Sequence, residues 1–224
     1  MKILWCITGA GQFLSESCEQ MMKISETNQV TVVFSDAGYE VARMYGLVDE
    51  IEKKFPDIVL GKRQGASAPL VGRLSKREYD KVIVAPCTAN TTAKIVCGIA
   101  DSIVTNIVAQ AGKCKVPVYI LPTDAKWIQK TRLPVTIDSI KCRNCRPCAA
   151  LQDCPTGAIY VSDGLRVDLT ECRGCGKCVT SCKYGAVELG KEIIIECRGI
   201  DVKNAETLKN VPGIHVISDI TETR

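Results

Sequence analysis

This chain is organised around the sequence CRNCRPC at residues 142–148 and its counterpart CRGCGKC at residues 172–178. Each triplet of cysteines is followed by one further cysteine, Cys154 and Cys182 respectively. The residues after these outlying cysteines also repeat, because CPTGAI at 154–159 answers CKYGAV at 182–187. An internal repeat of this kind predicts two pseudo-symmetric units that share one small core.

This spacing resembles the ligand pattern of two-cluster ferredoxins of the bacterial type. A cubane cluster needs four thiolates; three come from one tight triplet and the fourth from the other half of the repeat. We therefore expect a small α+β ferredoxin-like domain over residues 138–190, holding two [4Fe–4S] clusters. The expected ligands of the first cluster are Cys142, Cys145, Cys148 and Cys182, and those of the second are Cys154, Cys172, Cys175 and Cys178.

Two details depart from the usual ferredoxin pattern, and neither removes a ligand. Five residues rather than three separate Cys148 from Cys154, and Lys183 stands where a proline normally follows the fourth cysteine. Basic residues interleave with the ligands. They either raise the cluster potentials and steer an acidic ferredoxin, or only balance thiolate charge on a solvated surface. These are Arg143, Arg146, Arg173, Lys177 and Lys183.

Zinc and disulfides are the alternatives for so many cysteines. Zinc sites use pairs of C-x2-C rather than two triplets, each with an outlying fourth cysteine. Disulfides need an oxidising compartment, and the short apolar run at residues 3–7 is no export signal. The spacing therefore favours iron–sulfur clusters in a reducing cytoplasm.

Length and charge narrow the class of protein further. The chain has 224 residues, which suits one domain and a smaller module, and its net charge is only +4. No block of lysine or arginine stands out, so nucleic acid is not an expected partner. No apolar stretch is long enough to span a membrane.

The residues before the cysteines read as alternating strands and helices, which predicts a doubly wound parallel sheet of the flavodoxin-like or Rossmann-like class over residues 1–125. Residues 47–80 read as a long loop with one short helix, 126–137 as a linker, and 191–224 as a β-α-β extension whose packing the sequence leaves open. The strands are expected at 2–8, 29–34, 81–85 and 116–121, and helices at 15–25, 37–45, 89–98 and 99–111.

Small residues follow the first and third of these strands, at the sheet edge where open α/β folds bind ligands. The segment VAPCTANTTAKIVCGIAD at 84–101 resembles that of the homo-oligomeric flavin-containing cysteine decarboxylases. The resemblance implies FMN bound between the subunits of a trimer, often in a larger shell. It places Gly9, Ala10 and Gly11 at the FMN phosphate region, Ser35 against the flavin, and Pro86, Cys87, Thr88, Ala89 and Asn90 along the flavin site.

Two departures argue against decarboxylation in this chain. The decarboxylases carry a catalytic histidine shortly before the strand at 81–85, where this chain has LVGRLS at 70–75. Their substrate segment becomes PTDAKWIQ at 122–129, which does not match. The only histidine, His215, lies in an apolar run near the end of the chain and is expected to be structural.

A flavin domain joined to a two-cluster module resembles the archaeal iron–sulfur flavoproteins of the dihydromethanopterin reductase (acceptor) type. The resemblance implies reduction of dihydromethanopterin to tetrahydromethanopterin with electrons from ferredoxin. The combination makes chemical sense, because clusters carry single electrons and a flavin can pass them on in pairs. The alternative is an electron carrier with a protein acceptor and no pterin substrate; a decarboxylase with a redox appendage is a third possibility.

Overall fold

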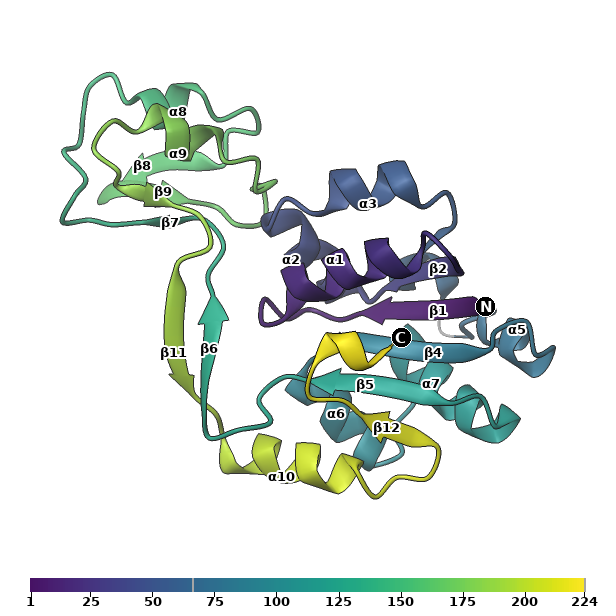
Figure 1. The fold of residues 1–224 in the computed structure, drawn as a ribbon. Helices are drawn as coiled ribbons and strands as arrows, with labels where there is room; N and C mark the ends of the chain where they lie inside the picture. Colours follow the sequence, from purple (N-terminus) through teal and green to yellow (C-terminus); the bar gives the residue numbers. More distant parts are fainter. Residues whose placement is uncertain (66, 224) are drawn as a thin grey trace.

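The computed structural model describes residues 1–65 and 67–223. At its centre lies a six-stranded sheet whose strands are all parallel, in the order β3-β2-β1-β4-β5-β12 (Figure 1). This is the Rossmann order, so the expected fold class is confirmed. The strands are β1 (Lys2–Ile7), β2 (Gln29–Phe34), β3 (Ile58–Leu60), β4 (Lys81–Cys87), β5 (Val118–Pro122) and β12 (Ile214–Val216).

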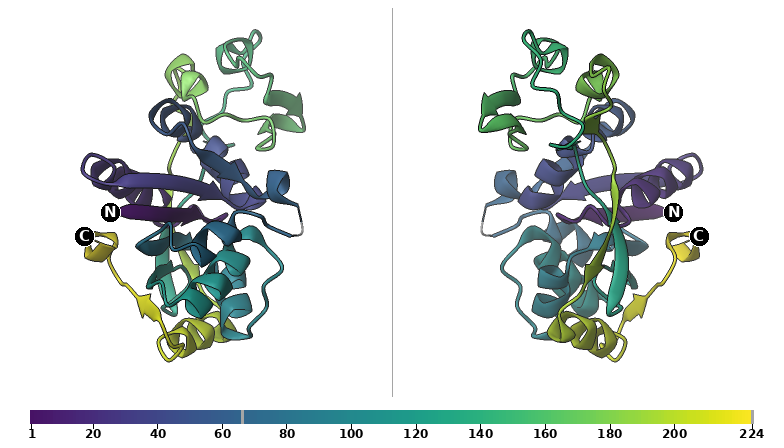
Figure 2. Two further views of the ribbon diagram at one scale, coloured as in Figure 1. Left: turned by 90° about the vertical axis from the view of Figure 1, so that its right-hand side faces the viewer. Right: turned by 90° about the vertical axis from the view of Figure 1, so that its left-hand side faces the viewer.

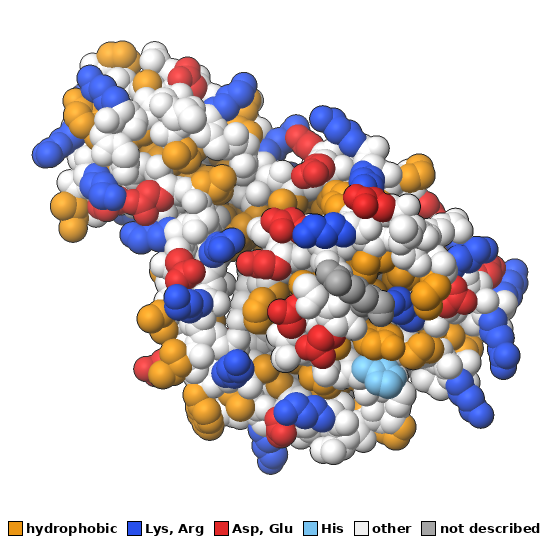
Figure 3. All heavy atoms as spheres, in the orientation of Figure 1, with side chains coloured by type: hydrophobic (Ala, Val, Ile, Leu, Met, Phe, Trp, Pro, Cys, Tyr) orange, Lys and Arg blue, Asp and Glu red, His pale blue; other side chains and the backbone are white. Residues whose placement is uncertain are grey.

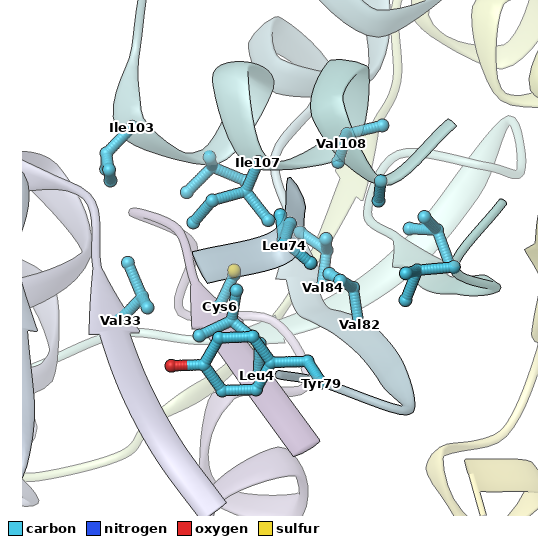
Figure 4. Packing of buried hydrophobic residues seen from close by; sticks show 14 of the residues in the cluster. Leu4, Cys6, Val33, Leu74, Tyr79, Val82, Val84, Ile103, Ile107 and Val108 are labelled. Atoms are coloured by element: carbon cyan, nitrogen blue, oxygen red, sulfur yellow. The ribbon is translucent and has the colours of Figure 1, made fainter. Parts of the chain in front are cut away.

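Both faces of the sheet are buried at its central strands, which explains why β1 and β4 are apolar along almost their whole length. Alternate residues of β1 enter different cores: Trp5 packs on one face, while Leu4 and Cys6 pack on the other (Figure 4). The first core takes α1 (Leu14–Ile24), α2 (Asp36–Met44) and α3 (Val48–Lys54); the second takes α5 (Val71–Ser75), α6 (Ala89–Val96) and α7 (Ile103–Cys114). No helix in the described part of the chain has the length and apolar character to cross a membrane.

The segment 47–80, expected as a long loop, contains regular structure. It forms α3, the strand β3, the short helix α4 (Gly61–Gln64) and α5. Strand β3 was missed because it has only three residues, too few to show a period. Pairing with β2 stabilises it, with Val33 opposite Val59.

The C-terminal residues return to the same sheet. After α10 (Gly199–Leu208), which packs beside α6, strand β12 extends the sheet beyond β5. The final turn η1 (Ile220–Thr223) covers α1, and Lys81 donates a hydrogen bond of 2.6 Å to the Thr223 carbonyl oxygen. The helix and the last strand of the extension whose packing the sequence left open therefore complete the sheet domain, whereas its first strand belongs to the ribbon described next.

The cysteine repeat forms a separate module beside the sheet domain, and a two-stranded ribbon joins the two (Figures 1 and 2). The ribbon pairs β6 (Ile128–Arg132) with β11 (Glu192–Glu196) in antiparallel fashion, so residues 126–137, expected as a linker, carry regular strand structure instead. Pairing with a strand some 60 residues away makes this structure invisible to a local reading. The module holds β7 (Thr136–Ile137), α8 (Ala149–Gln152), β8 (Ile159–Ser162), β9 (Gly164–Val167), α9 (Lys177–Ser181) and β10 (Val187–Glu188).

The packing of α5 against the sheet is open to a direct test. Leu74 is fully buried between α5, α7 and the sheet, so Leu74→Ala should destabilise the protein by about 2–5 kcal/mol through lost burial and a residual cavity. The same change at Leu189, which is 40% exposed, should cost about 1 kcal/mol or less. Denaturant unfolding followed through the buried Trp5 measures both, and equal effects would contradict this packing.

Candidate functional site

The sheet reverses its winding between β1 and β4, which are neighbours. The chain leaves β1 into α1 on one face and leaves β4 into α6 on the other. Such a switch point opens a crevice at the carboxyl ends of the two strands, where open α/β sheets bind their ligands. The segments 9–11 and 86–90, singled out in the sequence, border this crevice.

Thr8 fastens the two strand ends together, and sequence reasoning missed it. Its fully buried hydroxyl donates to the Pro86 carbonyl oxygen at 2.8 Å and accepts from the Thr88 N–H at 2.8 Å. A second bond runs from the Thr8 N–H to the same carbonyl, at 3.2 Å. The sequence does contain a signal for this role, since Thr8 is a hydroxyl-bearing residue at the end of an otherwise apolar strand. The single side chain of Thr8 thus holds the ends of β1 and β4 together.

Glycines allow the loops around the crevice to approach one another closely. A Cβ atom built on Gly9 would lie 2.6 Å from the Cβ of Ala37, and one on Gly38 would collide with the Ile7 carbonyl. One on Gly11 would collide with the Tyr45 hydroxyl. The first turn of α2 therefore packs directly on the end of β1, which brings Ser35 to the same edge as Gly9.

The hydroxyls of Ser35 and Thr88 cap the helices that begin at this edge. Ser35 Oγ accepts from the Gly38 N–H at 3.0 Å, and Thr88 Oγ1 accepts from the Thr91 N–H at 3.2 Å. Capping satisfies one N–H of each helix, and N–H groups that remain free in a first helical turn suit an anionic group such as a phosphate. Asn90, in the first turn of α6, is exposed. Small side chains, backbone N–H groups and an exposed amide fit a flavin and its phosphate.

Cys87 faces away from this edge. Its side chain is fully buried in the core under α7, with Sγ 3.5 Å from Thr92 Oγ1, and burial raises the pKa of its thiol to about 12. The thiol is therefore neutral and inert at ordinary pH. The side chain of Cys87 therefore contributes to core packing.

The ribbon stands across the same edge of the sheet (Figure 1). The side-chain amides of Gln12 and Gln129 hydrogen-bond to each other, and the Tyr45 hydroxyl donates to the Arg132 carbonyl oxygen. A cavity of about 180 Å³ lies between them, lined in part by Gly11, Tyr45 and Arg132. Residues far apart in the sequence meet here, so a reading of local motifs could not place them together.

The four cysteines expected to bind the first cluster line one cavity of about 280 Å³ in the cluster module. The triplet loop supplies three of them and Cys182 supplies the fourth. The tip of the β8–β9 hairpin and Tyr184 line the rest of the cavity. The arrangement brings both halves of the repeat to one site, which suits a cubane with four thiolate ligands.

The four cysteines expected to bind the second cluster also lie together. Burial raises the pKa of the Cys178 thiol, and the nearby thiols of Cys172, Cys175 and Cys154 raise it further. Four cysteines gathered around one place fit a site in which cationic iron would stabilise all four thiolates. The Gly174 N–H donates to Cys172 Sγ at 3.4 Å.

The two outlying cysteines have matching surroundings, as the repeat predicts. Burial acts to raise the pKa of the Cys154 thiol, but the N–H groups of Thr156, Ile159 and Ala158 outweigh it, so the pKa is lowered. The pKa of Cys182 is lowered in the same way, against the effect of burial, by the N–H groups of residues 184–187. Backbone N–H groups aimed at sulfur favour the thiolate form that binds iron.

A single-ion site has a different geometry from a cluster site. Within the residues described, no group of three or more His, Cys, Asp or Glu side chains is placed to hold one metal ion. In a cubane each thiolate binds a different iron, so the sulfurs stand further apart than around a single ion.

The residues that replace the decarboxylase histidine have structural roles. Leu70 and Leu74 are buried in the core against α7.

His215 lies on the edge strand β12 and stacks on Tyr119, with ring centroids 4.9 Å apart. Of the tryptophans, Trp5 is buried and donates to the Ala85 carbonyl oxygen, whereas Trp127 is 65% exposed.

Comparison with known proteins finds two family models that match different parts of the chain. The flavoprotein family model matches residues 1–135, and the 4Fe-4S binding domain model matches residues 165–188, which include the second triplet. Dihydromethanopterin reductase (acceptor) from Methanosarcina mazei is 38% identical, and the match covers 96% of this chain and 94% of that protein. The protein of the same name from Methanocaldococcus jannaschii is 43% identical, covering 97% of this chain and 92% of the relative.

Among solved structures, Burkholderia xenovorans DmrB in complex with FMN, described as a cubic protein cage for redox transfer, superposes with a TM-score of 0.63. The superposition covers 99% of this chain and 90% of the DmrB chain, at 23% identity, which shows a shared fold. The sequence matches extend over both the sheet domain and the cysteine module. The chain therefore belongs to the flavoprotein family and, within it, to the group whose curated members are named dihydromethanopterin reductase (acceptor).

Proposed function

We propose that this protein is an oxidoreductase that passes single electrons from a low-potential donor such as ferredoxin, through two [4Fe–4S] clusters, to an FMN site where dihydromethanopterin is reduced to tetrahydromethanopterin. The observation that carries the proposal is the arrangement of the chain. One polypeptide combines a switch-point sheet edge, bordered by two capped helix N-termini and closely packed glycines, with two complete sets of four cysteines. The module with these cysteines stands on the crevice side of the sheet (Figure 1).

The residues at the crevice bind and orient rather than react. Bound there, FMN supplies the conversion of single electrons into the pair that reduction of a C=N bond requires. The N-termini of α2 and α6 hold the phosphate, with Gly9, Ala10 and Gly11 allowing its close approach. Ser35 and Thr88 keep these helix ends in place by capping, and Asn90 offers an exposed amide to the flavin edge.

The cysteines of the module would hold the clusters in the two sets that the repeat predicts. Backbone N–H groups around Cys154 and Cys182 stabilise negative charge on sulfur and thereby tune the cluster potentials. We also propose that the protein works in a reducing cytoplasm, since exposed thiols such as that of Cys175 would be oxidised in an oxidising compartment. The proposal also includes a homo-oligomer built from trimers, for which the cage named in the DmrB structure is the support.

The first test uses anaerobically purified protein that carries both cofactors. The protein is reduced stoichiometrically and mixed with dihydromethanopterin while the flavin and cluster absorbance is followed. We expect rapid reoxidation of both with formation of the tetrahydro product. A reduced protein that reacts with ferredoxin but is not reoxidised by the pterin would contradict the reductase and favour an electron carrier with a protein acceptor.

The second test concerns Thr8. Thr8→Val keeps the shape of the side chain but leaves the Thr88 N–H without its partner, at a cost of about 1–3 kcal/mol. Because this loosens the crevice, affinity of the apoprotein for FMN should fall about tenfold, equivalent to ~1.4 kcal/mol. Titration of flavin fluorescence measures the change.

Thr31→Val is the matched control, since Thr31 is also buried but lies early in β2, with its hydroxyl 3.4 Å from that of Tyr79. This variant should bind FMN like the wild type. Equal FMN affinity in the two variants would show that the Thr8 hydrogen bonds do not support the site.

The third test concerns the ligand sets. Cys148→Ala removes one thiolate of the first set, so purified protein should contain about half of the wild-type iron, with one cluster signal remaining. Cys97→Ala changes an exposed cysteine outside both sets and should leave the iron content unchanged. Iron analysis and electron paramagnetic resonance of the reduced proteins measure both, and a full iron content in Cys148→Ala would disprove the assignment.

A further inference from the structure

The cluster module touches the sheet domain through the loop of the second cysteine triplet. Gly174, between Cys172 and Cys175, is buried against the end of α2: a Cβ atom built on it would collide with the Gly46 N–H and the Met44 carbonyl. The reverse holds for Gly46, whose Cβ would lie 2.6 Å from the Gly174 carbonyl oxygen. Two backbones therefore meet here with no side chain between them.

Further contacts hold this loop in place. The Arg43 guanidinium, in the last turn of α2, donates a hydrogen bond to the Thr170 carbonyl oxygen. Thr170 lies two residues before Cys172, the first cysteine of the second triplet, and its own hydroxyl donates to Asp168 at 2.6 Å. The second triplet is thus bound to α2 on both sides of Cys172.

Tyr45, the residue that follows the last residue of α2, connects this contact to the crevice. The Tyr45 hydroxyl reaches the Arg132 carbonyl oxygen and packs directly on Gly11, in the turn that follows β1. Tyr45 is partly buried, and burial raises the pKa of its hydroxyl, so the phenol is neutral. A continuous packed path runs from the second triplet through Gly46 and Tyr45 to Gly11.

The first triplet lies on the other side of the module. The segment from β7 to α8, which carries it, faces away from the sheet domain (Figure 1). Arg143 and Arg146 are exposed beside its cysteines and line the same cavity. Lys183, next to Cys182, is exposed as well. Basic side chains stand out over the module in Figure 3, and such a surface attracts an acidic protein.

We propose, on the basis of the proposed function, that the two clusters act in a fixed order: the first cluster accepts electrons from an acidic donor protein, and the second delivers them to the flavin across the contact of Gly174 with Tyr45 and Gly46. Held by these two sets of cysteines, the clusters would carry one electron at a time from the donor toward the flavin, each cluster returning to its oxidised form as the electron passes on. Two such passages, with two protons from solvent, fully reduce the flavin, so the donor is oxidised by two electrons in all.

The order is tested by removing one cluster at a time. In Cys175→Ala the donor should still reduce the first cluster, seen by electron paramagnetic resonance, while the flavin stays oxidised. In Cys148→Ala reduced donor should fail to reduce either the second cluster or the flavin, although a small chemical reductant still reduces both. The opposite pattern, with flavin reduced by the donor in Cys175→Ala, would overturn the proposal.

The contact is tested by Gly46→Ala, which lies outside the cysteine loop and should retain iron and flavin. We expect the donor to reduce its clusters at the wild-type rate, the fast phase of flavin reduction to be lost, and hydrogen exchange of residues 170–176 to increase. Gly213→Ala is the control for backbone strain, because Gly213 also has a positive φ but has open space around it.

A second pair keeps the test informative if Gly46→Ala folds poorly. Gly174→Ala introduces the same clash from the module side, and Gly176→Ala, in the same loop with a positive φ and open space, is its control. Wild-type flavin reduction in both contact variants would overturn the proposal. None of these measurements uses the pterin, so failure of the pterin to react would reject the proposed substrate while leaving the cluster order to be decided separately.

Discussion

The parallel pairing of β1 with β4 is the constraint on which the other features of this molecule depend. Because the chain leaves these neighbouring strands toward opposite faces, their ends separate and a crevice opens between them. The pairing also sets both ends at one level, so that the single hydroxyl of Thr8 can bond to Pro86 and Thr88 together. The apolar layers on both faces hold the strands in this register.

Close approach of backbone segments at glycines is a second constraint on this structure. At the crevice, Gly9, Gly11 and Gly38 let loops pack without side chains between them, and Gly46 with Gly174 does the same between domains. Substitution at these positions forces a collision with neighbouring atoms, whereas many other glycines of the chain have open space around them. Substitution should therefore affect packing at the first group of glycines and not at the second. The sequence alone does not distinguish the two groups, since only the folded chain shows what lies next to each Cα.

The features that sequence predicted were those with local signatures. The cysteine spacing predicted which thiols gather at each site, and alternating strands and helices predicted the parallel sheet. What it could not predict came from contacts between distant residues. Strand β3 is too short to show a period, β6 is a strand because of its pairing with β11, and Tyr45 meets Gly11 only through the fold. Cys87 matched the flavin-site motif by position, yet its thiol is fully buried in the core with residues of α7.

The course of the chain explains how two domains can hold a defined electron path. The chain leaves the sheet after β5, passes out along β6, forms the cluster module, and returns along β11 to complete the sheet with α10 and β12. The module is therefore an insertion tied at both ends, and the hydrogen bonds between β6 and β11 make the two connections one stiff ribbon. A module on a single flexible linker would sample many orientations and lose conformational entropy on each docking. Here the ribbon and the Gly46–Gly174 contact restrict the module at two separate points. The distance between the second triplet and the crevice is thus set by the fold itself and not by a transient encounter.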